Sequence, residues 1–237
     1  KLSVGATENS IIAACLAKGT TILKNCAIEP EIKDLTNFLN SAGAKISWFG
    51  KTCKIVGVNT LNSTEYSVMA DRIEAGTFCV AATLAKGNLK ISNLDAKIIK
   101  TELELLKRFG AKIKTHKEKI FIKGPEKIRP IKNIKTKEYP GIATDLQSQI
   151  MVLMCKANGK GSITENIFEN RFMHVAELRR LGAKIDVENN KAYIYGNTKF
   201  IGAELMSSDL RASVALVLAA IVSNGKSYIN RIYHLDR

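Results

Sequence analysis

The sequence predicts an α/β protein of repeated βαβαββ units, with buried helices inside and sheets around them, like an α/β barrel turned inside out. The first observation is the tetrad Gly-Ala-Lys-Ile, which begins at Gly43, Gly110 and Gly182. The second is a glycine before a short β-prone run, at positions 19, 87, 159 and 225. Both markers recur at intervals of about 70 residues, as expected for a structural repeat. They define three copies of one unit and the start of a fourth.

The third observation is that each unit contains two different helices. The first helix is Ala-rich and apolar nearly all round, near residues 7–17, 74–85 and 212–222, so we expect it to be buried. The marker glycine ends this helix, and a short strand follows. The second helix is one-sided, with Ile32, Leu35, Phe38 and Leu39 on one face in the first unit. It is therefore expected on the outside of the helix layer.

The remainder of each unit is expected to be β-structure. The tetrad glycine ends the second helix and leads into a hairpin, at 111–115 with 119–122 and at 183–187 with 192–195. A further strand, such as 66–69, is expected to lead into the next unit. The segment 123–140 holds three of the four prolines and separates the second unit from the third.

Composition excludes several classes of protein. The chain has 237 residues, of which 46% are hydrophobic and 24% charged, which is typical of a globular protein. Its longest apolar run, 214–222, is far shorter than the roughly 20 residues of a membrane-spanning helix, so no membrane span is predicted. Five cysteines without a C-x-x-C pair, far from the three histidines, predict no metal site and a reducing, cytoplasmic location.

The net charge of +14 is concentrated in one segment. Residues 97–137 contain fourteen Lys or Arg and four Glu. One interpretation is a surface that binds nucleic acid or another anion. The other, which we favour, is a solvated lysine-rich rim, because aromatic residues are few and no base-stacking pattern is present.

Polar residues recur where the buried helices should begin. Asp71, Asp145 and Asp209 occupy this position in three units, and Ser3 occupies it in the first. Asp and Ser at such places are typical N-caps. Asp145 differs because Thr144, Gln147 and Gln149 surround it, so the pattern leaves open whether it is a cap or a chemical group.

Three arginines stand at predicted helix starts. Arg171 and Arg237 each follow a marker glycine by twelve residues, where the second helix should open, and Arg211 follows Asp209 by two. Arginine there opposes the helix dipole, so helix stability does not explain it. Arginine together with free helix amides can bind a phosphate or carboxylate. The alternative for each arginine is a surface ion pair.

At these residues the sequence resembles the UDP-N-acetylglucosamine enolpyruvyl transferase family. The most specific segments are Glu-Asn-Arg-Phe-Met-His at 169–174 and Arg-Ile-Tyr-His-Leu-Asp-Arg at 231–237. Further matches lie at 1–9, 29–32, 71–77, 139–141 with 144–145, and 165–168, and a match that would be weaker by itself lies at 209–213, so the resemblance covers the whole chain. It implies the enolpyruvyl transferase fold, with two domains of three βαβαββ units each around a cleft.

The resemblance also implies an activity. The family transfers the enolpyruvyl group of phosphoenolpyruvate to the 3-hydroxyl of UDP-N-acetylglucosamine and releases phosphate, as the first committed step of peptidoglycan synthesis. It implies a cytoplasmic monomer without a cofactor or metal and with no nucleic-acid or membrane partner. The alternatives are enolpyruvylshikimate-phosphate synthase, of the same architecture, and an RNA-end-binding protein similar to RNA cyclases.

Residue roles follow from the same resemblance. The UDP-sugar is expected to contact Lys1, Leu2, Ser3, Val4, Asp145 and Ile167. Asp145 is the expected general base. Phosphoenolpyruvate is expected to bind Arg171, Arg211 and Arg237, of which the last two are also expected to be catalytic.

The resemblance further implies that the chain is a fragment. Residues 1–69 match the last part of the first domain, which carries the catalytic loop, and 70–237 match most of the second domain, truncated in its last unit. The family's Lys-Asn pair and its mobile loop with the catalytic acid, usually Cys, have no match here. We therefore expect the chain alone to be inactive.

Overall fold

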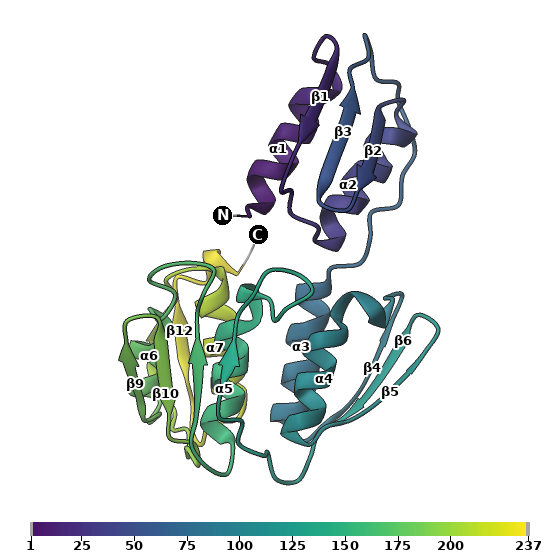
Figure 1. The fold of residues 1–237 in the computed structure, drawn as a ribbon. Helices are drawn as coiled ribbons and strands as arrows, with labels where there is room; N and C mark the ends of the chain where they lie inside the picture. Colours follow the sequence, from purple (N-terminus) through teal and green to yellow (C-terminus); the bar gives the residue numbers. More distant parts are fainter. Residues whose placement is uncertain (1, 236–237) are drawn as a thin grey trace. The chain divides into compact units, whose positions relative to one another are not determined.

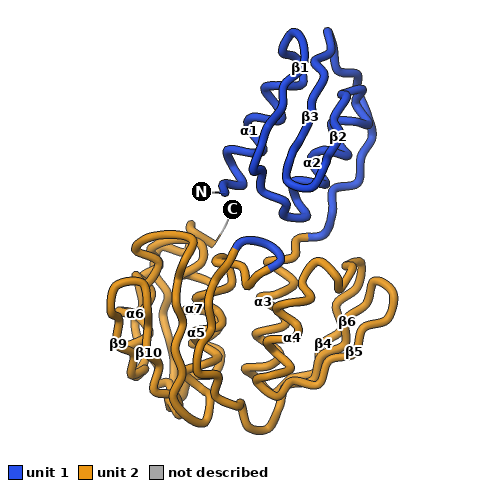
Figure 2. The backbone as a smooth tube through the Cα atoms, in the orientation of Figure 1, with its two compact units in different colours: residues 1–70, 138–140 blue, residues 71–137, 141–237 orange. Residues whose placement is uncertain are grey.

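The computed structural model describes residues 2–235, and the chain forms two compact units (Figure 2). Unit 1 comprises Lys1–Ala70 with Glu138–Pro140, and unit 2 comprises Asp71–Lys137 and Gly141–Arg237. The expected positions Lys1 and Arg237 lie outside the described residues.

Unit 1 is one three-stranded sheet covered by two helices (Figure 1). The sheet has the order β1-β3-β2 and is antiparallel throughout. Ile11 and Cys15 of the first helix pack with Ile32 of the second and with Cys53 and Ile55 of the central strand, and all are buried. The elements are α1 (Val4–Cys15), β1 (Thr20–Leu23), α2 (Pro30–Ser41), β2 (Lys45–Phe49) and β3 (Thr52–Val56).

Unit 2 contains the next repeats and the beginning of a further one. Its helices are α3 (Arg72–Leu84), α4 (Lys100–Phe109), α5 (Gln147–Lys156), α6 (His174–Arg180) and α7 (Leu210–Ile221), with the 3₁₀ turns η1 (Ala96–Ile99), η2 (Thr144–Leu146) and η3 (Ile232–His234). Its strands are β4 (Asn88–Ser92), β5 (Lys112–His116), β6 (Lys119–Lys123), β7 (Ile134–Lys135), β8 (Gly161–Thr164), β9 (Ile185–Glu188), β10 (Lys191–Ile194), β11 (Glu204–Met206) and β12 (Tyr228–Asn230).

The predicted inside-out arrangement is confirmed in unit 2. Helix α5 packs against both α3 and α7, and all its residues except Lys156 are buried. The sheets β4-β6-β5, β7-β8-β10-β9 and β11-β12 lie outside this helix layer (Figure 1). The one-sided helices α4 and α6 pack on α3 and α7. The apolar helices are thus inside because they have no face suited to water.

The tetrad glycines have the role that the sequence predicts. Gly43, Gly110 and Gly182 all have positive φ, at 100°, 108° and 96°. Such left-handed conformations stop a helix and suit glycine, which has no Cβ. Each glycine is therefore followed by a hairpin strand of its unit.

The expected strand at 66–69 is wrong, because no strand forms there. The Met69 amide lies 3.4 Å from a carboxylate oxygen of Asp34, and the Tyr66 hydroxyl donates to the same carboxylate. Side-chain acceptors of α2 thus take the place of a neighbouring strand. The equivalent segments before α5 and α7 do pair, as β7 with β8 and β11 with β12, both parallel.

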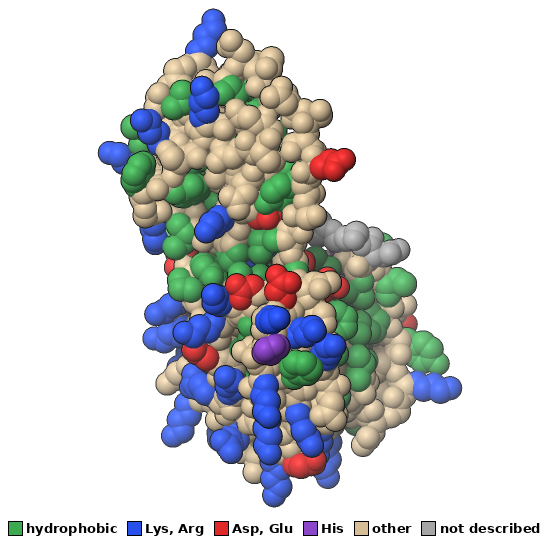
Figure 3. Space-filling view, turned by 90° about the vertical axis from the view of Figure 1, so that its right-hand side faces the viewer, with side chains coloured by type: hydrophobic (Ala, Val, Ile, Leu, Met, Phe, Trp, Pro, Cys, Tyr) green, Lys and Arg blue, Asp and Glu red, His purple; other side chains and the backbone are tan. Residues whose placement is uncertain are grey.

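The basic segment faces solvent over the outer sheet of the first repeat in unit 2. The register aligns Lys90 and Lys114 on either side of Phe121, and Lys112 beside Lys123, and all five are exposed. Figure 3 shows Lys and Arg side chains spread over this face of unit 2. Among residues 2–235, no helix is long and apolar enough to cross a membrane.

The buried helices begin with side-chain caps in three of the four repeats. The Ser3 hydroxyl accepts from the Ala6 amide at 3.2 Å, and Asp209 accepts from two amides of α7 at 2.9 and 3.1 Å. Asp145 does not cap α5, because the 3₁₀ turn η2 precedes that helix and supplies its first turn. The capping alternative for Asp145 is therefore wrong.

We predict that Asp71→Ala lowers the free energy of unfolding by about 0.5–2 kcal/mol, the usual value of an N-cap. The Asp71 carboxylate accepts from the amides of Ile73 at 2.7 Å and Glu74 at 3.0 Å. Urea unfolding followed by circular dichroism measures the change. Asp71→Asn, which retains the acceptor, should lose little, and equal losses in both variants would contradict the capping role.

Candidate functional site

A pocket of about 270 Å³ opens at the N-terminal ends of α5 and α7 in unit 2. Three segments that are far apart in the sequence form it: the turn η2 with the start of α5, the loop before α6, and the start of α7. The lining residues are Thr144, Gln147, Ser148, Phe168, Glu169, Asn170, Arg171, Met173, His174, Asp209, Arg211 and Ala212.

The pocket walls are fixed by contacts among the inner helices. The Ser148 hydroxyl lies 3.0 Å from the carbonyl oxygen of Arg211 and 2.8 Å from Oε1 of Gln149. The Gln149 side-chain amide donates to the hydroxyl of Thr77 in α3 at 3.1 Å. Helices α3, α5 and α7 are thus joined by polar bonds at the end where the pocket opens.

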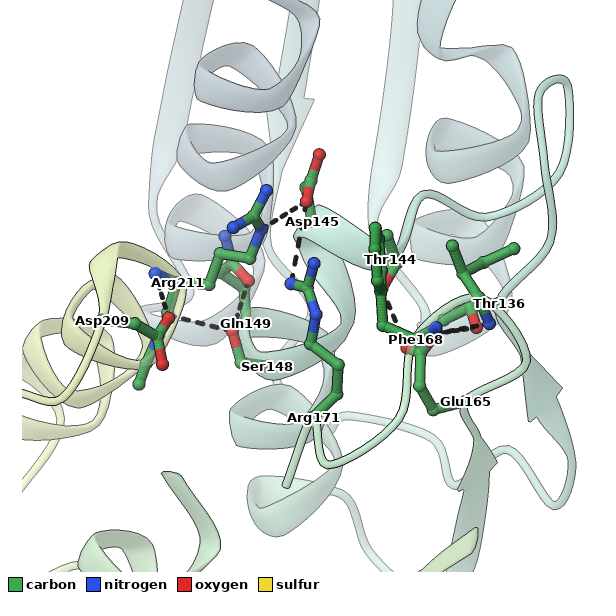
Figure 4. A network of polar contacts seen from close by, with 12 residues as sticks. Thr136, Thr144, Asp145, Ser148, Gln149, Glu165, Phe168, Arg171, Asp209 and Arg211 are labelled. Atoms are coloured by element: carbon green, nitrogen blue, oxygen red, sulfur yellow. Dashed lines mark hydrogen bonds and ion pairs between the residues drawn. The ribbon is translucent and has the colours of Figure 1, made fainter. Parts of the chain in front are cut away.

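The centre of the site is Asp145 with two arginines (Figure 4). Nε of Arg211 donates to Oδ1 of Asp145, and Nη1 of Arg171 lies 3.8 Å from the same oxygen. The structure thus brings together three of the residues predicted from the sequence. Two guanidinium groups that converge on one carboxylate form a site suited to anionic groups.

Arg171 is the more buried arginine of the pair, with 19% of its side chain exposed. Burial lowers the pKa of its guanidinium, the charge of Arg211 lowers it further, and Asp145, Glu165 and Asp209 oppose this. The guanidinium lies over the ring of Phe168 at 4.4 Å. An additional anion in the pocket would therefore be attracted to a partly desolvated cation.

The predicted place of Arg171 in its helix is wrong. Helix α6 begins at His174, so Arg171 lies three residues earlier, in the turn that precedes it. Glu169 and Asn170, directly before Arg171, are polar and exposed, and the buried apolar positions of the helix begin only at Val175. Its position depends on Phe168 and Asp145 and not on a helix N-terminus.

Two buried polar side chains near the pocket, Glu165 and His174, have environments that the sequence pattern does not predict. Glu165 is 2% exposed, yet its carboxylate accepts four hydrogen bonds from neighbouring segments. His174 is 3% exposed, and its Nε2 has no hydrogen-bond partner among the described residues. The specific segment 169–174 contains His174, but nothing in the pattern indicated that it would be buried.

The expected UDP-sugar residues lie in different parts of the chain. Leu2, Ser3 and Val4 are in unit 1, where Ser3 caps α1 and Val4 is its first residue. Ile167 lies in the loop of the pocket, and its amide donates to Glu165 at 2.8 Å. The roles of these residues toward a sugar nucleotide stay predictions.

We predict that the free energy of unfolding depends on pH through His174. Burial lowers the pKa of this imidazole from 6.5 to about 4; the charge of Asp209 opposes this shift, and the charge of Arg171 adds to it. Between these values the unfolded chain binds the proton and the folded chain does not. Protonation of the unfolded chain alone lowers the free energy of unfolding. The full stability is present above pH 6.5, and up to about 3 kcal/mol of it is lost as the pH falls toward 4.

Urea unfolding at pH 7 and pH 4.5 tests this. The wild-type chain should lose more stability between the two pH values than His174→Gln, which has no group to titrate. An equal loss in both proteins would show that His174 is not the cause.

The whole chain is similar to known proteins. The sequence model of the family described as EPSP synthase (3-phosphoshikimate 1-carboxyvinyltransferase) matches residues 1–237, and the chain belongs to this family. The UDP-N-acetylglucosamine 1-carboxyvinyltransferase of Pelagibacter ubique is 63% identical over 100% of this chain and 57% of its own length. A protein named UDP-N-acetylglucosamine 1-carboxyvinyltransferase 1, from Clostridium perfringens, is 50% identical over 99% of this chain and 56% of its own. The chain thus spans slightly more than half of these relatives.

Solved structures share the fold. The enolpyruvyl transferase NikO from Streptomyces tendae matches with a TM-score of 0.89 and 25% identity over 98% of this chain and 56% of its own. EPSP synthase from Acinetobacter baumannii matches with a TM-score of 0.71 and 19% identity over 99% of this chain and 58% of its own, which shows the fold alone.

Proposed function

We propose that this chain supplies part of the active site of an enzyme that transfers the enolpyruvyl group of phosphoenolpyruvate to the 3-hydroxyl of UDP-N-acetylglucosamine. The observation that carries the proposal is the convergence of Arg171 and Arg211 on Asp145 beside a pocket. The identity of 63% to a relative with this substrate in its name supports the sugar nucleotide over shikimate phosphate as acceptor. The proposal includes a cytoplasmic monomer that acts in peptidoglycan synthesis.

The domain assignment belongs to the same proposal. Residues 1–69 are the last part of the first domain, and 70–237 are most of the second. Lys1, Leu2, Ser3, Val4 and Ile167 then contact the UDP-sugar. Arg237 completes the arginine set for phosphoenolpyruvate. By the full-length enzyme we mean a protein of the length of these relatives, of which this chain corresponds to slightly more than half.

The chemistry is an addition followed by an elimination. The 3-hydroxyl oxygen attacks C2 of phosphoenolpyruvate, Asp145 accepts the hydroxyl proton, and an acid protonates the methylene carbon. Loss of a proton from that carbon then re-forms the double bond as the C2–O bond to phosphate breaks. In both steps, Arg171 and Arg211 stabilise the negative charge on the phosphate and carboxylate groups of phosphoenolpyruvate. Both arginines contact Oδ1 of Asp145, so its other oxygen, Oδ2, can accept the hydroxyl proton.

We predict that Asp145→Asn in the full-length enzyme lowers turnover by roughly 10²–10⁴, as expected for loss of a positioned base. Phosphate release from the two substrates measures this. Unfolding stability should change little, because Asp145 caps no helix. In the 237-residue chain, the same change should strengthen the binding of inorganic phosphate, because the native carboxylate competes for both arginines. Unfolding together with the loss of rate, or weaker phosphate binding, would contradict this role.

We predict that Arg171→Ala and Arg211→Ala each weaken phosphoenolpyruvate binding by roughly ten- to a hundredfold, the value of one charge-assisted contact. Lysine at either position should recover only part of the loss, because it lacks the planar fork of arginine. Calorimetric titration at fixed UDP-sugar measures the affinity. Arg180→Ala is the matched control, since Arg180 forms a surface ion pair with Glu177 at 3.8 Å. Weaker binding of the UDP-sugar alone would show that the arginines serve the other substrate.

A further inference from the structure

Glu165 has a carboxylate that is buried without an arginine or lysine in direct hydrogen-bond contact among the described residues. Its Oε1 accepts from the Thr136 hydroxyl at 2.9 Å and from the amides of Ile167 and Phe168 at 2.8 and 3.2 Å. Its Oε2 accepts from the Thr144 hydroxyl at 3.0 Å. All four donors are uncharged. Burying a charge is costly unless it is fully hydrogen-bonded, so these four bonds are what allows a carboxylate at this position.

The four bonds connect segments that carry the site (Figure 4). Thr144 is the first residue of η2 and immediately precedes Asp145. Phe168 belongs to the loop before α6, and its ring supports the guanidinium of Arg171. One carboxylate therefore joins the turn that carries the base to the loop that carries the more buried arginine.

The two oxygens of the carboxylate bind different segments of the chain. Oε1 fixes the loop, since it accepts the amides of Ile167 and Phe168. Oε2 fixes the turn, since it accepts the Thr144 hydroxyl. A glutamine has one acceptor oxygen and one donor nitrogen, so it can serve the loop or the turn but not both as acceptors. A carboxylate provides acceptor oxygens on both sides.

We propose that Glu165 is a positioning residue that sets the distance between the Asp145 carboxylate and the Arg171 guanidinium. This distance prepares the pocket to bind an anion and places Asp145 to accept a proton from the hydroxyl of the acceptor substrate. This inference rests on the proposed function for its catalytic part. Its structural part concerns anion binding by the 237-residue chain and does not depend on that function. Glu165 touches neither substrate in this scheme, and it acts through Thr144 and Phe168.

The test uses single changes along the connection. Thr144→Val removes only the bond from the turn, Thr144→Ser keeps it, and Glu165→Gln alters the acceptor itself. Ser162→Ala is the matched control. Ser162 is a buried residue of β8 outside the pocket, and its hydroxyl lies 2.7 Å from the carbonyl oxygen of Lys132. Each protein is first checked for folding by circular dichroism, and inorganic phosphate affinity is then measured well below the unfolding temperature.

We expect Thr144→Val and Glu165→Gln each to weaken phosphate binding about tenfold. Combined, they should weaken it by less than the product of the two single effects, because both changes affect the bond between Thr144 and Glu165. Thr144→Ser and Ser162→Ala should bind phosphate as the wild type does. In the full-length enzyme, the first two changes should lower kcat by roughly ten- to a hundredfold, as expected for a misplaced catalytic group. If Glu165→Gln does not fold, Thr144→Val gives the answer alone.

Two results would overturn the inference. One is unchanged phosphate affinity in folded Thr144→Val, and the other is full additivity in the double variant, which would mean that Thr144 contacts the anion by itself. If the full-length enzyme fails to transfer enolpyruvyl groups but the variants still weaken phosphate binding without additivity, the proposed function fails and the positioning role stands.

Discussion

The burial of helix α5 along its whole length is the constraint on which the rest of unit 2 depends. Its flanks are taken by α3 and α7, so polar side chains can gather only at its ends. The turn η2 forms at the N-terminal end, and Asp145 lies on that turn. The pocket is there because this is where the packed helix layer stops and polar groups again reach solvent.

The three carboxylates at this end of the helix layer differ in the number and kind of their hydrogen-bond donors. Asp209 is held by two amides of α7, and Glu165 is held by four neutral donors. Asp145 has only the two arginines as partners among the contacts described above, and about a third of its side chain is exposed. The carboxylate that we propose as the base is thus the one that receives no backbone hydrogen bond among these contacts.

The repeat pattern was sufficient to predict the inner and outer helices, the hairpins and the stops at the tetrad glycines. These features depend on local periodicity and on backbone conformation, which the residues of each unit determine by themselves. The strand at 66–69 was not predictable in this way, because strand formation needs a partner and Asp34 supplies competing acceptors there. The sequence also could not show that η2 would replace a cap before α5.

The site was predictable only in part. Asp145, Arg171 and Arg211 stood out because they occupy comparable places in a repeated framework. Glu165 did not, because a single glutamate after a strand is indistinguishable from a surface residue until the fold brings Thr136 and Thr144 to it. Its importance comes from contacts over 21 and 29 residues of sequence, which no local pattern contains.

The equivalence of Asp71, Asp145 and Asp209 has a consequence for how such a protein could acquire chemistry. Duplication of a unit copies its capping aspartate together with the helix it stabilises. Two copies here still perform that structural duty, on α3 and α7. In the third copy a short turn begins the helix, and the aspartate contacts two arginines in place of the helix amides. A repeated scaffold thus allows one copy of a capping residue to take other partners while the equivalent residues in the other copies still stabilise their helices.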